Sequence, residues 1–314
     1  MFSGKDNDNI HRGVEGKITS KSNLKKLFNE KNLNPRKLMG QHFLVDENIL
    51  QKIISAAGIA PGDKVIDIGA GPGALSLELC RMGCSVIAIE WDRGLADLLR
   101  EQANLKEFQD IHVVEGDVRR MNLEDIGANF WGEEVIRGGE KGKNIKVVAN
   151  LPYYLTTPLL FQLLQGKLNL ELLVLMVQLE VARRIQASPG TKDYGVLSLL
   201  CSYYTSPQLL FKVSRNVFFP TPEVDSAVVL LEVLSLPRVH VKDEQIFWTI
   251  VRSAFQKRRK IILNALSGSI GVEKEKWKQL LQKARISAER RGETLSLNEF
   301  ANLCDIFYNE YSGE

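Results

Sequence analysis

Short runs of apolar, β-branched residues alternate along the chain with longer segments whose apolar positions recur every three or four residues. The runs are too short for helices, whereas the longer segments have the period of amphipathic helices. Strands that alternate with helices in this way are typical of a parallel sheet with helices on both faces. The predicted strands are Lys64–Ile68, Ser85–Ile89, Ile111–Glu115, Lys146–Ala149 and Leu172–Val177, with Leu209–Val213 and Ala227–Leu234 as a hairpin-like pair that closes the sheet.

The pattern changes near both ends of the chain. Residues 1–23 are polar and mixed in charge and lack the apolar core of a signal peptide, so we predict a disordered tail. We expect an α/β domain over residues 24–238 and, because every later segment has a helical pattern, a small all-helical domain over 239–314. Residues 127–144 contain five glycines and mixed charges, and we interpret them as a surface excursion.

Composition narrows the class of protein. The chain has 314 residues and is 44% hydrophobic, yet no apolar run approaches the length of about 18 residues that a membrane span needs. None of the four cysteines forms a Cys-x-x-Cys pair. We therefore expect buried thiols in a reducing cytosol, no metal site, no membrane partner and a cytoplasmic protein that acts as a monomer.

The net charge of +3 is unevenly distributed. Residues 51–150 carry 12 basic and 16 acidic side chains, whereas residues 251–314 carry 12 basic and 8 acidic ones, including four consecutive cations at 257–260. Basic ends around an acidic middle suit a nucleic-acid surface built from both termini. The alternative is that these cations only lie on solvated helix faces.

A glycine-rich turn, Gly69–Gly73, follows the first predicted strand and precedes a helix. Glycines let a ligand approach the main chain, and the next strand ends in Glu90, whose carboxylate can accept from both hydroxyls of a ribose. A nicotinamide dinucleotide is the competing ligand, but the Gly-x-Gly-x-Gly spacing differs from the Gly-x-Gly-x-x-Gly fingerprint of its sites. Because Asp67 suits an ammonium group and would repel a pyrophosphate, the turn favours S-adenosylmethionine (SAM).

Two polar residues follow the third and fourth predicted strands, at the edge where open α/β sheets bind ligands. Asp117 can accept from the adenine amino group of the cofactor, or it can cap a turn. The stretch Asn150–Tyr153 combines an amide, a proline bend and an aromatic ring, like the catalytic loop of SAM-dependent enzymes that methylate exocyclic amino groups of bases. An ordinary strand-to-loop turn is the alternative interpretation.

Phe218 begins a stretch, residues 218–226, in which two spaced prolines predict a stiff loop. Such a loop can hold an aromatic ring in place. We expect Phe218 and Tyr153 to stack on the two faces of a base that has left its own stack. The alternative is that Phe218 is a core ring beneath the loop.

With these motifs in order, together with Gln41–Leu44 and the cationic Phe255–Lys260, the chain closely resembles the ribosomal RNA adenine dimethyltransferases of the small-subunit (KsgA) type. The resemblance covers residues 24–314. It implies a Rossmann-like, SAM-dependent methyltransferase sheet with helices on both faces, followed by a small all-helical, RNA-binding domain.

The resemblance also implies roles for individual residues. The cofactor-binding residues are His42 and Leu44 at the methionine end, Gly69 through its main chain, Glu90 at the ribose, Asp117 at the adenine, and Asn150. The catalytic residues are Asn150, Leu151, Pro152, Tyr153 and Phe218. The Asn150 side-chain oxygen and a carbonyl of the Leu151–Pro152 turn are expected to accept the two amino hydrogens of the target adenine.

The implied reaction is N6,N6-dimethylation of two adjacent adenosines in the 3′-terminal hairpin loop of small-subunit rRNA. The implied partner is the immature small ribosomal subunit, with a role in its maturation. A related family dimethylates a single adenosine of large-subunit rRNA and confers antibiotic resistance; Leu151 and Asp225 favour the small-subunit type. Two other classes stay open at this point. One is a methyltransferase of DNA or protein, and the other is an RNA-binding ribosome assembly factor with weak catalysis.

Overall fold

The computed structural model describes residues 18–35, 40–104, 110–137, 145–257 and 259–311. Contacts between residues divide the chain into two compact units. The first unit ends at Gln178 and resumes for Phe211–Val228, and the second comprises Leu179–Leu210 and the chain from Val229 onward. Helix α9 (Val196–Tyr204) belongs to the second unit because it contacts helices α10 (Glu244–Gln256) and α13 (Leu297–Tyr311). The compact units thus divide earlier in the chain than residue 238, the predicted domain boundary.

A seven-stranded sheet has the order β4-β3-β2-β5-β6-β9-β7. The strands are β2 (Lys64–Ile68), β3 (Ser85–Glu90), β4 (Ile111–Glu115), β5 (Ile145–Asn150), β6 (Leu170–Gln178), β7 (Thr205–Val213) and β9 (Ser226–Val233). Strands β4, β3, β2, β5 and β6 pair in parallel, as the alternating pattern predicts. The last two strands lie together at one edge, so the prediction that they close the sheet is also confirmed.

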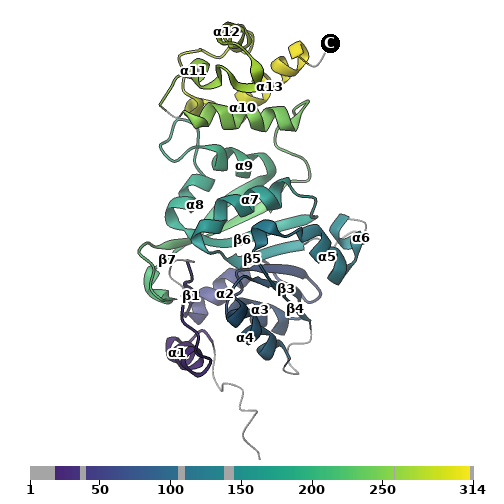
Figure 1. The fold of residues 1–314 in the computed structure, drawn as a ribbon, viewed down its shortest axis with the longest axis vertical. Helices are drawn as coiled ribbons and strands as arrows, with labels where there is room; N and C mark the ends of the chain where they lie inside the picture. The colour runs from purple at the N-terminus through teal and green to yellow at the C-terminus, as the bar shows by residue number, and fades with distance from the viewer. Residues whose placement is uncertain (1–17, 36–39, 105–109, 138–144, 258, 312–314) are drawn as a thin grey trace, which may run out of the picture. The chain divides into compact units, whose positions relative to one another are not determined.

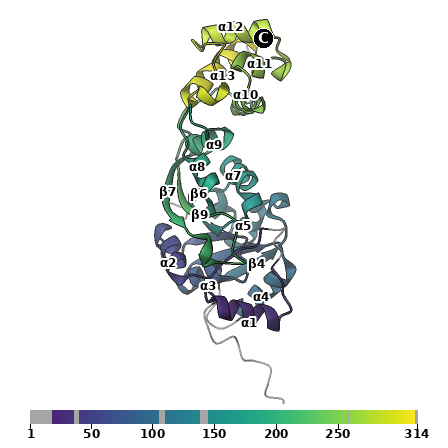
Figure 2. The same cartoon turned by 90° about the vertical axis from the view of Figure 1, so that its left-hand side faces the viewer.

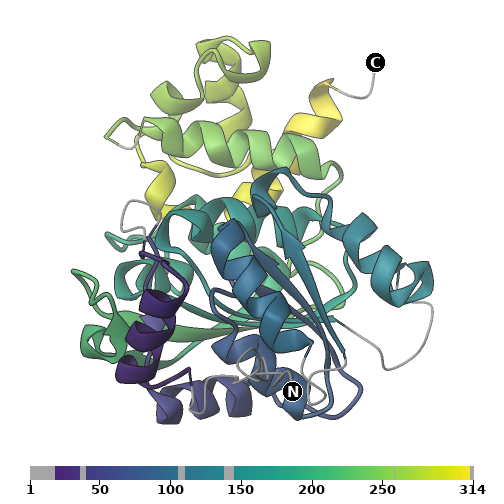
Figure 3. The same ribbon diagram turned by 60° about the horizontal axis from the view of Figure 1, so that its bottom comes forward.

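Helices cover both faces of the sheet in the first unit. They are α1 (Lys21–Glu30), α2 (Glu47–Ala56), α3 (Ala74–Arg81), α4 (Arg93–Ala103), α5 (Leu123–Trp131), α6 (Glu133–Arg137) and α7 (Thr156–Gln165). Helices α2, α3 and α4 lie on one face, and α5 and α7 lie on the other (Figure 1). Blue helices of this unit pass in front of the strands in Figure 3. Asp46 caps the N-terminus of α2, because its carboxylate accepts from the Ile49 N–H at 3.0 Å.

The predicted surface excursion at 127–144 is partly wrong. Its described part belongs to helices α5 and α6, and residues 138–144 lie outside the described residues. Trp131 is 7% exposed, and its indole N–H donates to the Ser85 hydroxyl at 2.9 Å. Val135 and Ile136 are also buried. The glycine content concealed an apolar face that packs into the first unit, which is why this stretch is helical.

A second, two-stranded sheet joins distant parts of the first unit. Strand β1 (Phe43–Leu44) pairs antiparallel with β8 (Phe218–Phe219), so the motif Gln41–Leu44 is in part a strand. Helix α1 packs beside α4 (Figure 2), where its Leu24 and Phe28 share an apolar cluster with Phe43. Of the predicted tail, residues 1–17 lie outside the described residues, whereas Lys21 already begins α1.

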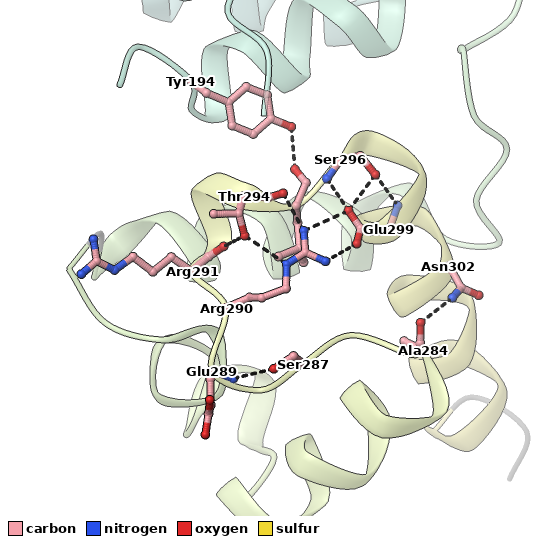
Figure 4. A network of polar contacts seen from close by, with 11 residues as sticks. Tyr194, Ala284, Ser287, Glu289, Arg290, Arg291, Thr294, Ser296, Glu299 and Asn302 are labelled. Atoms are coloured by element: carbon pink, nitrogen blue, oxygen red, sulfur yellow. Dashed lines mark hydrogen bonds and ion pairs between the residues drawn. The ribbon is translucent and has the colours of Figure 1, made fainter. Parts of the chain in front are cut away.

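The second unit is mainly helical, as predicted for the C-terminal part of the chain. Its helices are α8 (Leu179–Ile185), α9, α10, α11 (Ile262–Leu266), α12 (Lys274–Lys283) and α13. Arg290 forms an ion pair with Glu299 and donates to the Thr294 carbonyl at 2.6 Å (Figure 4). The Arg290 carbonyl accepts from the Ile262 N–H at 2.6 Å, so this network holds the segment after α10 against the loop before α13.

Candidate active site

A cavity lies in the first unit where strands β2, β3, β4 and β5 end at their carboxyl edge. Its wall is formed by five segments, Gly40–Phe43, Ile68–Gly69, Ile89–Asp92, Gly116–Val118 and Asn150–Leu155. These segments contain all the residues to which the resemblance assigns a role in catalysis or cofactor binding, except Leu44 and Phe218. The structure therefore brings together residues that are separated by more than a hundred positions in the sequence, at the edge predicted from the strand pattern.

The glycine turn rests directly on the catalytic stretch. Gly69 has a φ of +75°, which favours glycine, and a Cβ built at this position would lie 2.8 Å from the Cδ of Pro152. Real Cβ atoms essentially never come so close to another heavy atom. Glycine is therefore required both by the conformation of the turn and by its approach to Pro152, and the two predicted motifs form one surface.

Glu90 lies on the inner wall of this cavity, at the end of β3. Its side chain is buried, and each carboxylate oxygen accepts one main-chain hydrogen bond, from the N–H of Gly71 and from the N–H of Asp92, both at 2.8 Å. Burial raises the pKa of Glu90, and the bonds from Asp92 and Gly71 oppose that rise. The carboxylate is thus held rigidly while each oxygen keeps a further lone pair for a hydroxyl donor.

Asp117 lies at the rim of the cavity. Three side chains near it, those of Arg119, Trp91 and Tyr154, were not predicted from the sequence. The guanidinium of Arg119 donates to the Asp117 carboxylate, with Nε 2.9 Å from Oδ1 and Nη2 2.6 Å from Oδ2. These bonds to Arg119 lower the pKa of Asp117. The same guanidinium lies 5.5 Å from the ring of Trp91 and 5.4 Å from the ring of Tyr154, within cation–π range. Trp91 follows Glu90 and Tyr154 follows Tyr153, so their positions next to predicted site residues could have indicated that they belong to the site.

Asn150 ends strand β5 with its amide fixed by a distant main-chain group. Its Nδ2 donates to the His42 carbonyl at 3.1 Å, which orients Oδ1 as the acceptor of the side chain. In the following turn, the Pro152 carbonyl accepts from the Leu155 N–H at 2.9 Å. Of the two carbonyls in the Leu151–Pro152 turn, that of Leu151 is therefore better placed to act beside Asn150 Oδ1 as the second acceptor of an amino hydrogen.

Tyr153 begins a short 3-10 helix, Tyr153–Leu155, and is half-buried. Its hydroxyl lies 3.0 Å from the Ser226 hydroxyl, and its ring centroid lies 5.5 Å from that of His42. Burial raises the pKa of Tyr153, and the bond to Ser226 opposes the rise. His42 is itself anchored, because its Nδ1 donates to the Pro220 carbonyl at 2.7 Å. Sequence reasoning did not assign this positioning role to Ser226.

The structure places two predicted residues away from this cavity. Phe218 is 1% exposed and pairs with Leu44 in the two-stranded sheet, so its ring is a core ring rather than a stacking surface. The expected sandwich of a base between Tyr153 and Phe218 is wrong for this conformation, because the β1–β8 pairing buries Phe218. Leu44 lines a smaller neighbouring cavity that shares Phe43, Gly69 and Asn150 with the larger one.

Asp67 lines the smaller cavity and is almost completely buried. Its side chain is 1% exposed and accepts from the Ser76 hydroxyl at 2.5 Å. Burial raises the pKa of Asp67 to about 7, although the bond from Ser76 opposes the rise. A carboxyl group of this kind gains from a cationic neighbour, which stabilises its ionised form.

The described residues offer hydrogen-bond acceptors rather than metal ligands. Within them no group of three or more His, Cys, Asp or Glu side chains is arranged to hold a metal ion. No described helix is long and apolar enough to cross a membrane. The four cysteines are free and buried, as predicted. The arrangement can orient an amino group and a ribose-containing ligand through fixed oxygen atoms.

Comparison with known proteins adds the family context. A model of the family described as ribosomal RNA adenine dimethylase matches residues 32–303. Ribosomal RNA small subunit methyltransferase A of Pelotomaculum thermopropionicum is 44% identical over 291 residues, which cover 92% of this chain and 97% of that protein. The protein of the same name from Moorella thermoacetica is 48% identical over 277 residues, covering 88% and 94%.

Two solved structures are similar to this chain in fold. A dimethyladenosine transferase from Plasmodium falciparum has a TM-score of 0.67 at 23% identity, and covers 85% of this chain and 98% of its own. The 23S rRNA methyltransferase ErmE has a TM-score of 0.57 at 21% identity, with 84% and 98% covered. Both agree with a Rossmann-like methyltransferase sheet.

Proposed function

Because the chain belongs to the ribosomal RNA adenine dimethylase family, and is thus a SAM-dependent rRNA methyltransferase, we propose that it dimethylates two adjacent adenosines at N6. Their place is the 3′-terminal hairpin loop of small-subunit rRNA, in small subunits that are still maturing. The relatives at 44% and 48% identity are named for the small subunit, which supports this choice. The observation that supports the chemistry most directly is the Asn150 amide, held by the His42 carbonyl beside Tyr153.

The cavity residues fit SAM. Glu90 would accept from the ribose hydroxyls and Asp117 from the adenine amino group, and Gly69, which lines the cavity, would face the cofactor with its main chain. The smaller cavity with Leu44 and Asp67 would take the methionine end, since a nearly buried carboxyl gains from an ammonium partner. Bound SAM would supply an activated methyl group, so the protein itself needs no strong base.

The residues of the catalytic stretch act on the target amino group. Its nitrogen is a poor nucleophile because the lone pair is delocalised into the ring. Asn150 Oδ1 and the Leu151 carbonyl would each accept one amino hydrogen, which favours a pyramidal nitrogen with its lone pair directed at the methyl group. Tyr153 would stack on one face of the flipped base, and the proton can leave to solvent after transfer. A monomethylated amine still has one hydrogen to donate, so a second transfer is chemically open.

The C-terminal part of the second unit would grip the RNA. Lys257, Arg259 and Lys260 follow α10 in the segment that the Arg290 network holds in place; Arg258 lies outside the described residues. We assign residues 239–314 to RNA binding through phosphate contacts, and residues 24–238 to methyl transfer. Arg259→Ala combined with Lys260→Ala should lower the salt slope of RNA binding by about one unit per lost contact. Lys274→Ala with Lys278→Ala removes the same charge from exposed positions of α12 and serves as the control.

Mass mapping tests the proposed substrate. Immature small subunits from cells without such an enzyme are incubated with SAM and this protein, and the RNA is digested with nuclease. Four methyl groups on two neighbouring adenosines are the expected product. A single modified adenosine in large-subunit RNA would favour the resistance-type reaction, and unmodified RNA beside intact assembly activity would favour an assembly factor.

A further inference from the structure

Arg119 is held at the cavity rim by three side chains from different segments of the first unit. Its guanidinium is paired with Asp117 and lies over both Trp91 and Tyr154. The two rings are 43% and 39% exposed, and their centroids are 6.5 Å apart. The guanidinium therefore stands between the proposed adenine contact, Asp117, and the catalytic stretch that ends beside Tyr154.

Among the described residues, three N–H groups of Arg119 donate to the Asp117 carboxylate. Its main-chain N–H donates to Oδ1 at 3.1 Å, Nε lies 2.9 and 3.2 Å from the two oxygens, and Nη2 donates to Oδ2 at 2.6 Å. An ionised carboxylate offers about four lone-pair positions. Three N–H groups of Arg119 thus share these positions, and an adenine amino group that donates to Asp117 competes with the guanidinium for them.

We propose that Arg119 couples the binding of cofactor to the binding of RNA, an inference that rests on the proposed contact of Asp117 with adenine. In the free protein Arg119 covers Asp117. The adenine amino group displaces the guanidinium, which then lacks a carboxylate partner beside Tyr154, where the target strand arrives. A planar guanidinium binds phosphate through paired N–H donors, so the released side chain takes a phosphate group of the RNA.

The coupling has a defined size and direction. Cofactor raises RNA affinity, and RNA must raise cofactor affinity by the same factor, because coupling between two sites is reciprocal. Because Arg119 is 40% exposed, the pair that breaks is a surface ion pair, and we expect a factor of about two to five.

Binding measurements on the full chain test this role. S-adenosylhomocysteine, which carries the same adenine and no transferable methyl, is titrated by calorimetry with and without a small-subunit rRNA hairpin. In the native protein each ligand should tighten the other about two- to fivefold. Arg119→Met keeps an unbranched apolar side chain without the guanidinium, and should bind S-adenosylhomocysteine more tightly in the absence of RNA while losing the coupling. Weaker or unchanged binding by this variant, or undiminished coupling, would overturn the proposal.

Two further variants separate this inference from the proposed site. Arg120→Met removes the same charge from the adjacent, exposed position, and should weaken RNA binding without changing the coupling. If Arg120→Met abolishes the coupling as well, general charge rather than Arg119 is responsible. Asp117→Ala should weaken S-adenosylhomocysteine; if it does not, the adenine contact itself is wrong. If it does and Arg119→Met has no effect, only the coupling is wrong.

Discussion

The inner wall of the cavity and its rim hold polar side chains in different ways. Glu90 and Asn150 on the inner wall are fixed by main-chain groups, two N–H donors and the carbonyl of His42. At the rim, Asp117 and Arg119 fix each other, with side chains that are 12% and 40% exposed. Main-chain partners stay in place when a ligand arrives, whereas side-chain pairs in contact with water can exchange partners. The inner wall is thus preorganised, and the rim can respond to ligands.

Electrostatics separates the same two regions. Burial raises the pKa values of Glu90 and Asp67, whereas the neighbouring Arg119 lowers the pKa of Asp117. The two buried carboxyl groups, Glu90 on the inner wall and Asp67 in the smaller cavity, therefore carry a charge that is costly until a ligand compensates for it, whereas the charge of Asp117 at the rim is already compensated. Substitutions on the inner wall should have the larger effects.

The largest effect is expected for Asn150→Ala. If Oδ1 accepts an amino hydrogen mainly in the transition state, kcat should fall about 100- to 1,000-fold while binding of SAM and RNA changes little. Single-turnover kinetics with saturating RNA measures the loss, and calorimetry checks cofactor binding. Turnover near that of the native protein would remove Asn150 from the catalytic role.

The next effect concerns Glu90→Ala. Loss of the proposed charge-assisted bonds to the ribose should weaken SAM binding by about 1–3 kcal/mol. Glu115→Ala is the matched control, because Glu115 pairs with Glu90 in the adjacent strand and is exposed. Calorimetry on folded protein should find a loss only for Glu90→Ala, and equal affinities for the two variants would contradict the ribose contact.

Asp67 should make stability depend on pH. The unfolded chain releases this proton near the ordinary pKa of 3.8 and the folded protein only near 7, so the folded state binds more protons between these values. The free energy of unfolding should therefore fall as pH rises from about 4 to about 7, by up to about 1.4 kcal/mol per pH unit. Above that range this contribution is constant.

Asp67→Asn tests this dependence, because the amide oxygen can still accept from Ser76 and no proton is released. Urea denaturation at several pH values should show that the variant gains stability relative to the native protein as pH rises through this window. A constant difference between the two proteins would mean that Asp67 is ionised throughout.

The smallest effect is expected for Tyr153→Phe. The ring that we propose to stack on the base is kept, and the hydrogen bond to Ser226 is lost, so activity should change less than about threefold. Ser226→Ala removes the same bond from the other side and should match it. Tyr153→Ala provides the contrast, since it removes the ring and should raise KM for RNA. A large loss in Tyr153→Phe alone would point to a role of the hydroxyl beyond positioning.

Most of the fold and much of the site could be predicted from local patterns. Strand β2 begins and ends at the predicted residues, and the glycine turn, Glu90, Asp117 and Asn150 each follow a predicted strand. Because the carboxyl ends of parallel strands share one edge, strand order alone places these residues around one cavity. The helices at 123–137 were missed, since glycines obscured the buried face around Trp131.

The sequence by itself therefore determined which elements form and which residues reach the carboxyl edge of the sheet, since both depend on periodicity and on residues close along the chain. Only the tertiary structure decided what each side chain does there. Phe218 is buried where β1 pairs with β8. Asn150 is hydrogen-bonded to His42 across 108 positions, and Tyr153 to Ser226 across 73. Such contacts depend on register and on the packing of distant segments, and a shift of one residue in a strand would turn each side chain to the opposite face.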